Sequence, residues 1–435
     1  MDTNKVFKSS MGFKLAVIVF LAILLLIPTF MIMELVKERE SRKNEAITEV
    51  GSKWGGEQTL AGPILAIPYR DVNNNIEQLY FLPSKLTVKG DIVPQILQRG
   101  IYKITAYKST LEFAGEFTNP YVNNLGISQS QINWDQATLL IGISDMRGLN
   151  EKIEAQWDGQ NVALEPINNI SIDNVQSKAG AKVVLSDYSN QAQIYKYSFS
   201  LQLNGVQSLN FIPVGSETTV ALNSSWGNPS FYGSFLPDER EVGENGFKAN
   251  WKILEVNRNF GQQWTKLPST NITDSAFGVK LLSGVDEYQK ITRSIKYAIM
   301  TIILTFLIFF FIEVLNKKRV HPLQYILVGS ALVLFFSLLL ALSEHIGFNP
   351  AYLSASIATI LAITLYSSSI FKSLKLTLLQ SAFLIIIYVF IFIIIQLQDY
   401  ALLVGNIGLF VVLVIIMFIS RKVDWYAAGA KDLTN

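Results

Sequence analysis

The sequence predicts an α+β membrane protein, with six transmembrane helices and a large antiparallel all-β, sandwich-like domain inserted between helices 1 and 2. Three observations lead to this fold class: an apolar run near the N-terminus, five apolar runs in the C-terminal third, and period-two alternation between them. Each run has about 20 residues or more, the length that crosses a hydrocarbon core of about 30 Å. These runs are apolar all round, so a soluble bundle would leave them no polar face for water.

The first apolar run predicts transmembrane helix 1 over residues 13–36, after a short N-terminus at 1–12. The run is long and bulky and lacks an A-x-A-like cleavage pattern, so we interpret it as an uncleaved anchor. Pro28 predicts a kink, because proline removes a helical hydrogen bond. Residues 37–56 remain helix-favouring and predict a charged stalk helix that leaves the membrane.

The middle of the chain, residues 57–290, alternates apolar and polar residues and predicts the β-domain. Asp158-Gly159, between two strand candidates, is typical of a two-residue hairpin. Residues 129–135 predict one short helix. The strand candidates are 63–70, 78–82, 85–89, 101–107, 110–117, 138–143, 153–157, 161–165, 181–185, 193–203, 208–213, 218–223, 247–254 and 276–281.

The five C-terminal runs predict transmembrane helices 2–6, followed by a tail at 421–435. Lysine and arginine occur in alternate joints between the runs, whereas the joints with Glu344 and Asp399 contain neither. Short loops rich in Lys and Arg stay in the cytoplasm, so we expect both termini to be cytoplasmic and the β-domain to lie outside. The expected helices are 294–315, 321–343, 347–371, 375–396 and 400–420, and the basic joint residues are Lys317, Lys318, Arg319, Lys372, Lys375, Arg421 and Lys422.

The composition argues against several classes of chemistry. The absence of cysteine excludes disulfides and cysteine-ligated zinc, and a net charge of +2 gives no case for a nucleic-acid partner. The chain has two histidines and neither a G-x-S-x-G nor an H-E-x-x-H motif, so we expect no catalytic residues, no metal site and no cofactor. Ser369 and Lys372 match S-x-x-K, but they lie at an expected cytoplasmic helix end and the supporting motifs of that enzyme class are missing.

The segment 226–240 combines aromatic residues with Gly and Pro, and we expect no strand to run through it. One interpretation is an aromatic surface that binds a partner. The alternative is a packed loop whose aromatic side chains fill the edge of the domain or rest on the membrane. The candidate partner residues are Trp226, Phe231, Tyr232 and Phe235.

Ionisable residues of the C-terminal third lie near the ends of the expected helices, where water is reachable: Glu313, Glu344, His345 and Asp399. Glu344 and His345, at the outer interface of the third span, are a candidate polar functional pair that responds to protons. The alternative is a hydrogen-bonded cap at the interface. Asn406 and the other uncharged polar residues of the spans are typical of helix packing.

Several segments, in order along nearly the whole chain, resemble the CreD family of bacterial inner-membrane proteins. The resemblance implies a multi-pass protein of a Gram-negative inner membrane with a periplasmic domain, connected with cell envelope integrity and envelope stress. It implies no reaction and no catalytic residues. The segments are 62–68 (GPILAIP), 144–148 (SDMRG), 225–226 (SW), 235–237 (FLP), 240–242 (REV), 286–289 (DEYQ), 296–298 (KYA), 321–325 (HPLQY), 342–345 (LSEH) and 423–426 (VDWY).

Three hypotheses of function follow. The first is a non-enzymatic protein whose periplasmic β-domain contacts an envelope protein, a lipid or the cell wall, with the bilayer as its other partner. The second is a transporter or conduit for an envelope component through the six-helix bundle. The third, an envelope enzyme, requires acids such as Asp145, Asp238 and Glu239 to converge in one cleft.

Overall fold

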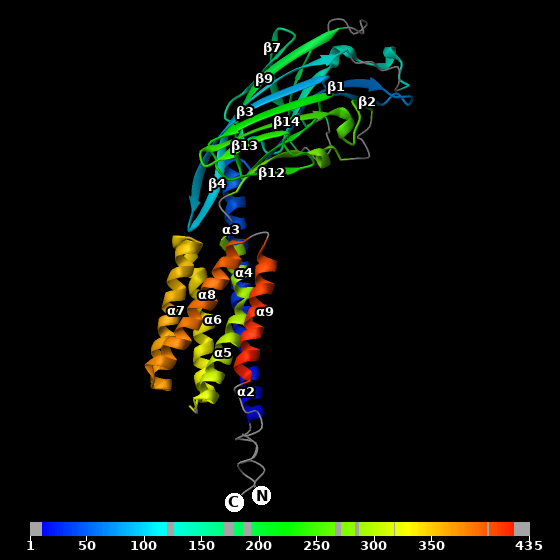
Figure 1. Cartoon of the computed structure of the whole chain (residues 1–435). Coiled ribbons are helices and arrows are strands. Elements are labelled where there is room, and N and C mark those ends of the chain that lie inside the picture. Colours follow the sequence, from blue (N-terminus) through cyan, green and yellow to red (C-terminus); the bar gives the residue numbers. More distant parts are fainter. Residues whose placement is uncertain are drawn as a thin grey trace, which may run out of the picture. The chain divides into compact units, whose positions relative to one another are not determined.

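The chain folds into two compact units, Met1–Arg42 with Val285–Asn435 and Lys43–Gly284 (Figure 1). The first unit is helical and the second is built around a β-sheet. The computed structural model describes residues 11–119, 126–168, 170, 177–185, 193–265, 271–282, 287–316, 318–397 and 400–421. Lys317, Asp399 and Lys422, used above for the orientation, lie outside these ranges.

Within the described ranges, six helical stretches are long and apolar enough to cross a membrane, one near the N-terminus and five toward the C-terminus. This confirms the predicted arrangement of spans around a strand-rich middle. The helices are α2 (Met11–Leu24), α3 (Leu26–Trp54), α4 (Glu287–Lys296), α5 (Ala298–Leu315), α6 (Pro322–Ile346), α7 (Phe348–Phe371), α8 (Leu374–Gln396) and α9 (Ala401–Ser420).

The N-terminal span is interrupted at Leu25, three residues before Pro28. Pro28 has no N–H to donate to the carbonyl of Leu24, and its ring crowds that turn. Thr29 compensates in part, because its hydroxyl donates to the Leu25 carbonyl at 2.9 Å. Beyond this break α3 continues to Trp54, so the predicted stalk is the second half of the same helix.

One short helix, α4, was not predicted. The sequence assigns residues 287–290 to the β-domain and 294–296 to transmembrane helix 2, but residues 287–296 form an amphipathic helix of their own, and α5 begins only at Ala298. Tyr288, Ile291 and Ile295 occupy one buried face at helical spacing. The apolar run alone could not show this break, because α4 and α5 are separated only at Tyr297.

The β-domain contains one sheet path of strands in the order β12-β16-β10-β1-β5-β8-β7-β6-β9-β4-β3-β11-β14-β13, with β2 and β15 attached beside β1. The described strands are β1 (Gln58–Arg70), β2 (Ile76–Phe81), β3 (Lys85–Arg99), β4 (Tyr102–Thr118), β5 (Thr138–Ile143), β6 (Ile153–Trp157), β7 (Gln160–Pro166), β8 (Ser177–Lys182), β9 (Ile194–Val206), β10 (Ser208–Ile212), β11 (Glu217–Ser224), β12 (Pro229–Gly233), β13 (Glu239–Gly243), β14 (Gly246–Leu254), β15 (Gln263–Trp264) and β16 (Phe277–Leu281).

The sheet is mixed, which corrects the expected antiparallel arrangement. β1 pairs with β10 and β3 pairs with β11 in parallel, whereas the other pairings between described strands are antiparallel. Period-two alternation carries no information about strand direction, so the sequence could not reveal these two pairings.

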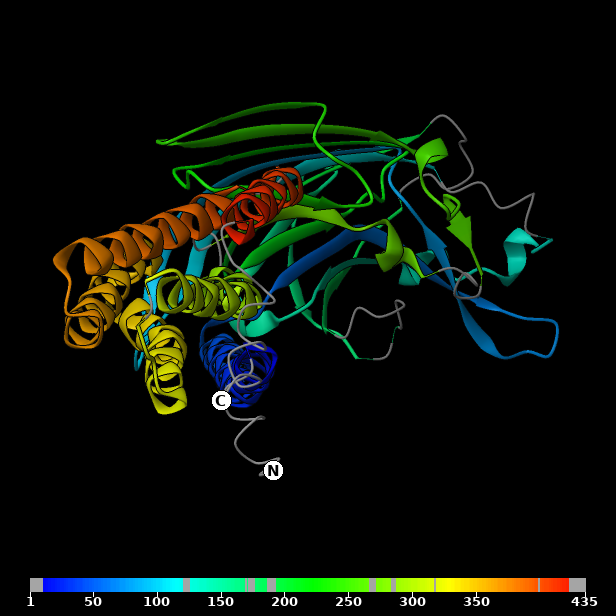
Figure 2. The same ribbon diagram turned by 60° about the horizontal axis from the view of Figure 1, so that its bottom comes forward.

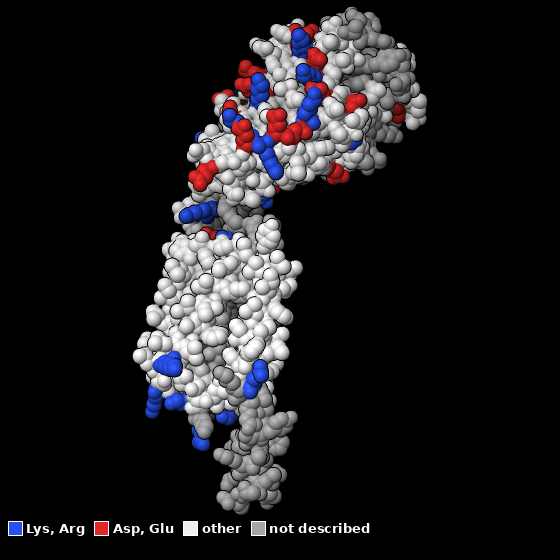
Figure 3. Space-filling view, in the orientation of Figure 1, with Lys and Arg blue, Asp and Glu red and all other residues white. Residues whose placement is uncertain are grey.

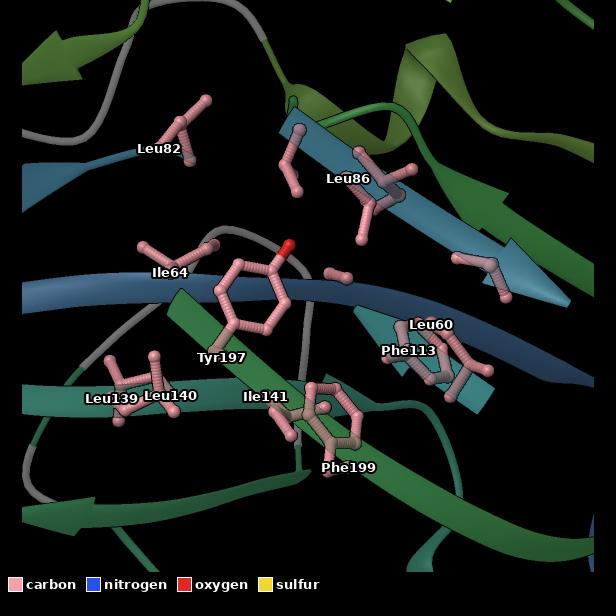
Figure 4. Packing of buried hydrophobic residues seen from close by; sticks show 14 of the residues in the cluster. Leu60, Ile64, Leu82, Leu86, Phe113, Leu139, Leu140, Ile141, Tyr197 and Phe199 are labelled. Carbon is pink, nitrogen blue, oxygen red and sulfur yellow. The ribbon is translucent and has the colours of Figure 1, made fainter. Parts of the chain in front are cut away.

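Both halves of the sheet path face one apolar core, and Figures 1 and 2 show the strands curving around it. Ile64 of β1 and Leu140 of β5 come from one half, and Phe113 of β4 and Phe199 of β9 come from the other (Figure 4). The rings of Phe113 and Phe199 stack with their centroids 4.6 Å apart. The core therefore joins the two halves in a sandwich-like domain.

Local signals in the sequence gave mixed results. Asp158 and Gly159 form the predicted hairpin turn between β6 and β7, with φ values of +46° and +82°. The two strands expected at 101–107 and 110–117 are one strand, β4, and the short helix expected at 129–135 is two 3₁₀ turns, Gln129–Gln131 and Trp134–Gln136.

β12 corrects the expectation that no strand runs through the aromatic segment. Pro229 is the first residue of β12, which among the described strands pairs with β16 alone, at the end of the sheet path. An edge strand tolerates proline there, because no neighbouring strand needs its missing N–H.

Two tyrosine–glycine pairs fix the contact between β4 and β9. Tyr107 of β4 lies opposite Gly205 of β9, and Tyr197 of β9 lies opposite Gly115 of β4. A β-carbon on either glycine would overlap the facing tyrosine ring. Both tyrosines are buried, and their hydroxyls donate to the carbonyls of Ser208 at 2.7 Å and Lys85 at 3.1 Å.

Gly205→Ala is expected to lower the free energy of unfolding of the β-domain by about 1–3 kcal/mol, because the buried Tyr107 ring has no room to move aside. Gly243→Ala is the matched control, since a β-carbon there meets no atom within 4 Å. Denaturant titrations followed by tryptophan fluorescence measure the unfolding midpoints of the two variants. The signal reports on the β-domain, because six of the seven tryptophans lie between residues 43 and 284. Equal midpoints for the two variants would contradict the packing argument.

Candidate functional site

A groove with a volume of about 520 Å³ crosses the outer face of β3, β11 and β14. The side chains of Val88, Val220 and Trp251 on these strands are buried in the core, so their neighbours along each strand point outward. We call this feature the β14 groove and define it by its outward residues and two adjoining acids: Thr87, Lys89, Thr219, Ala221, Asn250, Lys252, Asp238 and Glu239.

The strand register explains the shape of the β14 groove. One row across the strands is Lys89, Ala221, Asn250 and Glu239. Ala221 carries only a methyl group between longer neighbours, which leaves a hollow at the middle of the row.

A second row of the β14 groove is Thr87, Thr219 and Lys252. The two threonine hydroxyls are 3.1 Å apart, and the amide of Asn250 in the first row donates to Glu239 at 3.4 Å. Lys252 reaches Glu217 at 3.4 Å. The groove therefore offers both donors and acceptors, and Figure 3 shows charges of both signs on this part of the domain.

Sequence reasoning missed the β14 groove. Its only signal was the alternation along β3, β11 and β14, which separates outward polar residues from inward apolar ones. Alternation does not tell which strands are neighbours, and β3 and β11 are far apart in the chain. A hollow formed by three strands could be recognised only once their register was known.

The four predicted aromatic residues do not form one exposed surface. The Phe231 ring packs edge-on against Phe247 and Trp251, at centroid distances of 5.6 and 5.7 Å, and the Phe235 ring packs against Phe277 at 6.1 Å. These two rings fill the edge of the core.

Trp226 also packs against the core, but its indole N–H is engaged at the edge, whereas Tyr232 is exposed. The Trp226 indole donates to the carbonyl of Leu282 at 3.1 Å and to that of Asn228 at 3.2 Å. Tyr232 follows Phe231 on β12 and is the exposed member of the set. Neighbouring strand residues point to opposite faces, which explains this difference.

Glu344 and His345 have different surroundings. The side chain of Glu344 is only 10 % exposed, accepts a hydrogen bond from the Tyr288 hydroxyl at 3.1 Å, and lies 3.9 Å from the Arg39 guanidinium. His345 is exposed. Consecutive helix residues point about 100° apart, so the partners of Glu344 come from α3 and α4 instead.

α4 also binds the end of α8 through basic side chains. Arg293 donates to the carbonyls of Leu397 at 2.7 Å and Ile394 at 3.2 Å, at the end of α8 where helix carbonyls need partners from outside the helix. Lys290 donates to the side chain of Gln396 at 3.1 Å, and Gln396 donates in turn to Asn349 at 2.6 Å. α4 is therefore a polar clamp across the ends of α6, α7 and α8.

Glu313 is more buried than the sequence indicated. It lies near the end of α5, but its side chain is only 4 % exposed. It accepts hydrogen bonds from Lys14 of α2 at 2.7 Å, from the Tyr325 hydroxyl of α6 at 3.2 Å and from the backbone N–H of Val320 at 3.3 Å. These partners come from separate segments of the chain, so no local sequence pattern predicts that they meet at Glu313.

Asp145 has a structural environment. It accepts hydrogen bonds from the Gly56 N–H at 2.9 Å and twice from the Arg147 guanidinium at 2.8 Å, while Arg147 also donates to the Ser52 carbonyl at the end of α3. Burial raises the pKa of Asp145, but the hydrogen bonds from Arg147 and Gly56 outweigh it and hold the pKa below its ordinary value.

Asp238 and Glu239 lie in other surroundings, where Asp238 accepts a hydrogen bond from the backbone N–H of Lys252 at 2.6 Å. The structure thus gives Asp145 one set of partners and Asp238 with Glu239 another, which does not provide the single acidic cleft that an enzyme hypothesis required. Across the described ranges, no group of three or more His, Asp or Glu residues is arranged to hold a metal ion.

Asp145→Asn is expected to lower the free energy of unfolding by about 1–2 kcal/mol at pH 7, because charge-assisted bonds are lost at a site where Arg147 is 61 % exposed. The pKa of folded Asp145 lies below the ordinary value of 3.8, so its contribution is present above pH 3.8 and is lost as the pH falls through the lowered pKa. Fluorescence-detected melting from pH 7 downward measures this. The exposed Asp158→Asn is the control, and a deficit for Asp145→Asn that stays constant at every pH would refute the argument.

Comparisons with known proteins identify the family to which this chain is similar. The family model described as "Inner membrane protein CreD" matches residues 10–426. The inner membrane protein CreD of Escherichia coli (strain K12) is 31% identical over 432 residues, which cover 97% of this chain and 95% of that protein.

Among solved structures, a crystal structure of an M1 zinc metallopeptidase variant from Deinococcus radiodurans, bound to a Tyr-Ser-Ala substrate, covers 51% of this chain and 54% of that one. Its identity is 8% and its TM-score is 0.22, so the likeness carries no argument. The family match over nearly the whole length and the identity to the E. coli protein agree with the six candidate spans. This chain is a multi-pass membrane protein that belongs to the CreD family of inner membrane proteins.

Proposed function

We propose that this protein supports cell envelope integrity without catalysis, by contact between its β-domain and an envelope partner. In this proposal the β-domain is periplasmic and both termini are cytoplasmic. The spans hold the domain at the membrane, and the domain supplies the binding surface.

The distribution of basic residues supports this orientation. Basic side chains gather where α5, α7 and α9 end and where α2, α6 and α8 begin: Lys14, Lys318, Arg319, Lys372, Lys375 and Arg421. The opposite helix ends carry Glu344 beside Arg39, and the basic side chains of α4 there, Lys290 and Arg293, donate hydrogen bonds to the end of α8. Lys and Arg in short loops stay on the cytoplasmic side, so the connections to the β-domain leave from the other side.

The β14 groove is the observation that carries the proposed contact. Its hydroxyl, amide, ammonium and carboxylate groups suit a polar, chain-like partner, such as an extended peptide or a glycan of the envelope. The Thr87–Thr219 and Asn250–Glu239 contacts join groups of the groove to one another. This arrangement favours binding by hydrogen bonds over a reaction, which would need a nucleophile placed beside a base.

Ala221→Trp is expected to fill the hollow of the β14 groove and to reduce crosslinking of the protein to its envelope partner at least fivefold in living cells. In a strain that depends on this protein for envelope integrity, tolerance of envelope stress should fall together with the crosslinking. Thr110→Trp, on the exposed side of β4, is the matched control and should behave like the natural chain. Undiminished crosslinking in a correctly folded Ala221→Trp variant would exclude the groove as the contact surface.

Reporter fusions test the topology separately from the contact. A fusion after Asn168 is expected to report a periplasmic location, whereas fusions after Asn316 and Asn435 should report the cytoplasm. A cytoplasmic signal from the Asn168 fusion would overturn the orientation and the proposed contact together.

A transporter or conduit for an envelope component is the second candidate. The observation that favours it is an apolar groove of about 370 Å³ between α5, α8 and α9. If the protein is a conduit, we expect tolerance of envelope stress to be retained in the Ala221→Trp variant and to be lost in the Glu344→Gln or Asn406→Leu variant. The contact proposal predicts the reverse pattern, so the same tolerance assay separates the two.

A further inference from the structure

The groove between α5, α8 and α9 has a continuous apolar lining. It includes Leu304 of α5, Phe390 of α8 and Val412 of α9, and every side chain that lines it is apolar. All three helices are among those long and apolar enough to span a membrane. The groove therefore lies at the depth of lipid tails, where water is not available to fill it.

The length of the groove fits a lipid tail. The share of α9 in its wall runs from Gly408 to Ile419, which is about 17 Å at 1.5 Å per residue. This is about half of a hydrocarbon core of about 30 Å, the depth that the tails of one leaflet occupy.

The other helices bury too little of α9 for protein contacts alone to hold it against the bundle. None of its residues is buried. Its close approach to α8 is at Gly408, where a β-carbon would overlap the Phe390 ring. The groove extends from this contact toward the C-terminal end of α9, so an occupant would cover the face of α9 that α5 and α8 leave open.

A cation follows the end of the groove wall in the chain. Ile419 belongs to the wall, and the exposed Arg421 follows two residues later. Lys318 and Arg319 follow the end of α5 in the same way. Arginine binds phosphate through paired N–H donors, and basic groups at the ends of transmembrane helices bind anionic lipid head groups.

We propose that this groove binds one acyl chain of an anionic phospholipid, with the lipid phosphate at Arg421. The bound chain fills the space between α9 and the bundle, and the phosphate fixes the end of α9. The lipid is thus a structural ligand of the helical unit, and this role is independent of what the β-domain contacts.

Native mass spectrometry of the full-length protein, purified in mild detergent and incubated with phosphatidylglycerol or phosphatidylcholine, tests the proposal. The natural chain should retain one phosphatidylglycerol at least fivefold better than phosphatidylcholine. Val412→Trp fills the groove and should reduce retention of phosphatidylglycerol at least fivefold. Leu413→Trp, the next residue on α9 and outside the lining, is the control and should retain it.

Arg421→Gln should abolish the preference for phosphatidylglycerol, whereas Lys375→Gln, which removes an exposed basic residue at the start of α8, should leave it unchanged. Equal retention of the two lipids by the natural chain, or equal losses in Val412→Trp and Leu413→Trp, would overturn the proposal.

A measurement on the unaltered sequence keeps the test decisive if a variant fails to fold. Phosphatidylglycerol with a photoreactive group on its acyl chain is reconstituted with the natural protein in liposomes, and the crosslinks are mapped. Crosslinks concentrated at least fivefold on Val412, Ile416 and Ile419 relative to Phe410 and Leu413 support the groove. An even distribution around α9 shows ordinary lipid contact and overturns it.

Discussion

A polar group inside a bilayer has no water to bind, and this constraint shapes the helical unit. The spans meet it for their backbone by being helical, and they meet it for several side chains by pairing across helices. Ser367 of α7 donates to Gln380 of α8 at 2.6 Å, and Thr364 and Ser381 are 2.7 Å apart. For the same reason, the carboxylate of Glu313 accepts hydrogen bonds from three partners in separate segments. Polar side chains in this unit therefore join helices.

The structure of the β-domain depends instead on the alternation of inward and outward side chains along its strands. Each strand sends one set of side chains into the common core and the other set outward, so the strands that build the sheet also form its outer surface and the β14 groove. The short side chain of Ala221 makes the hollow in that surface, while Val220 beside it is buried in the core. A contact function thus needs no structure beyond what the fold already provides, whereas catalysis would need reactive groups that converge.

The sequence was sufficient for the spans, because length and apolar composition are local properties that leave only one solvent for such helices. It was sufficient for the Asp158-Gly159 hairpin, because the turn chemistry lies in two adjacent residues. It was insufficient where distant residues meet. The burial of Glu313 depends on Lys14 and Tyr325, and the β14 groove depends on strands β3 and β11, which are far apart in the chain. β12 was missed because proline and glycine usually signal a loop, although an edge strand accepts both.

The facing pairs of β4 and β9 also bear on how such a chain can diverge. Tyr107 occupies the space that Gly205 leaves empty, and Tyr197 does the same over Gly115. A larger residue at Gly205 would require a smaller ring at Tyr107, whereas a β-carbon at Gly115 would also overlap the backbone carbonyl of Lys85. Over evolutionary time Tyr107 and Gly205 should therefore be replaced together or not at all, whereas Gly115 should remain glycine.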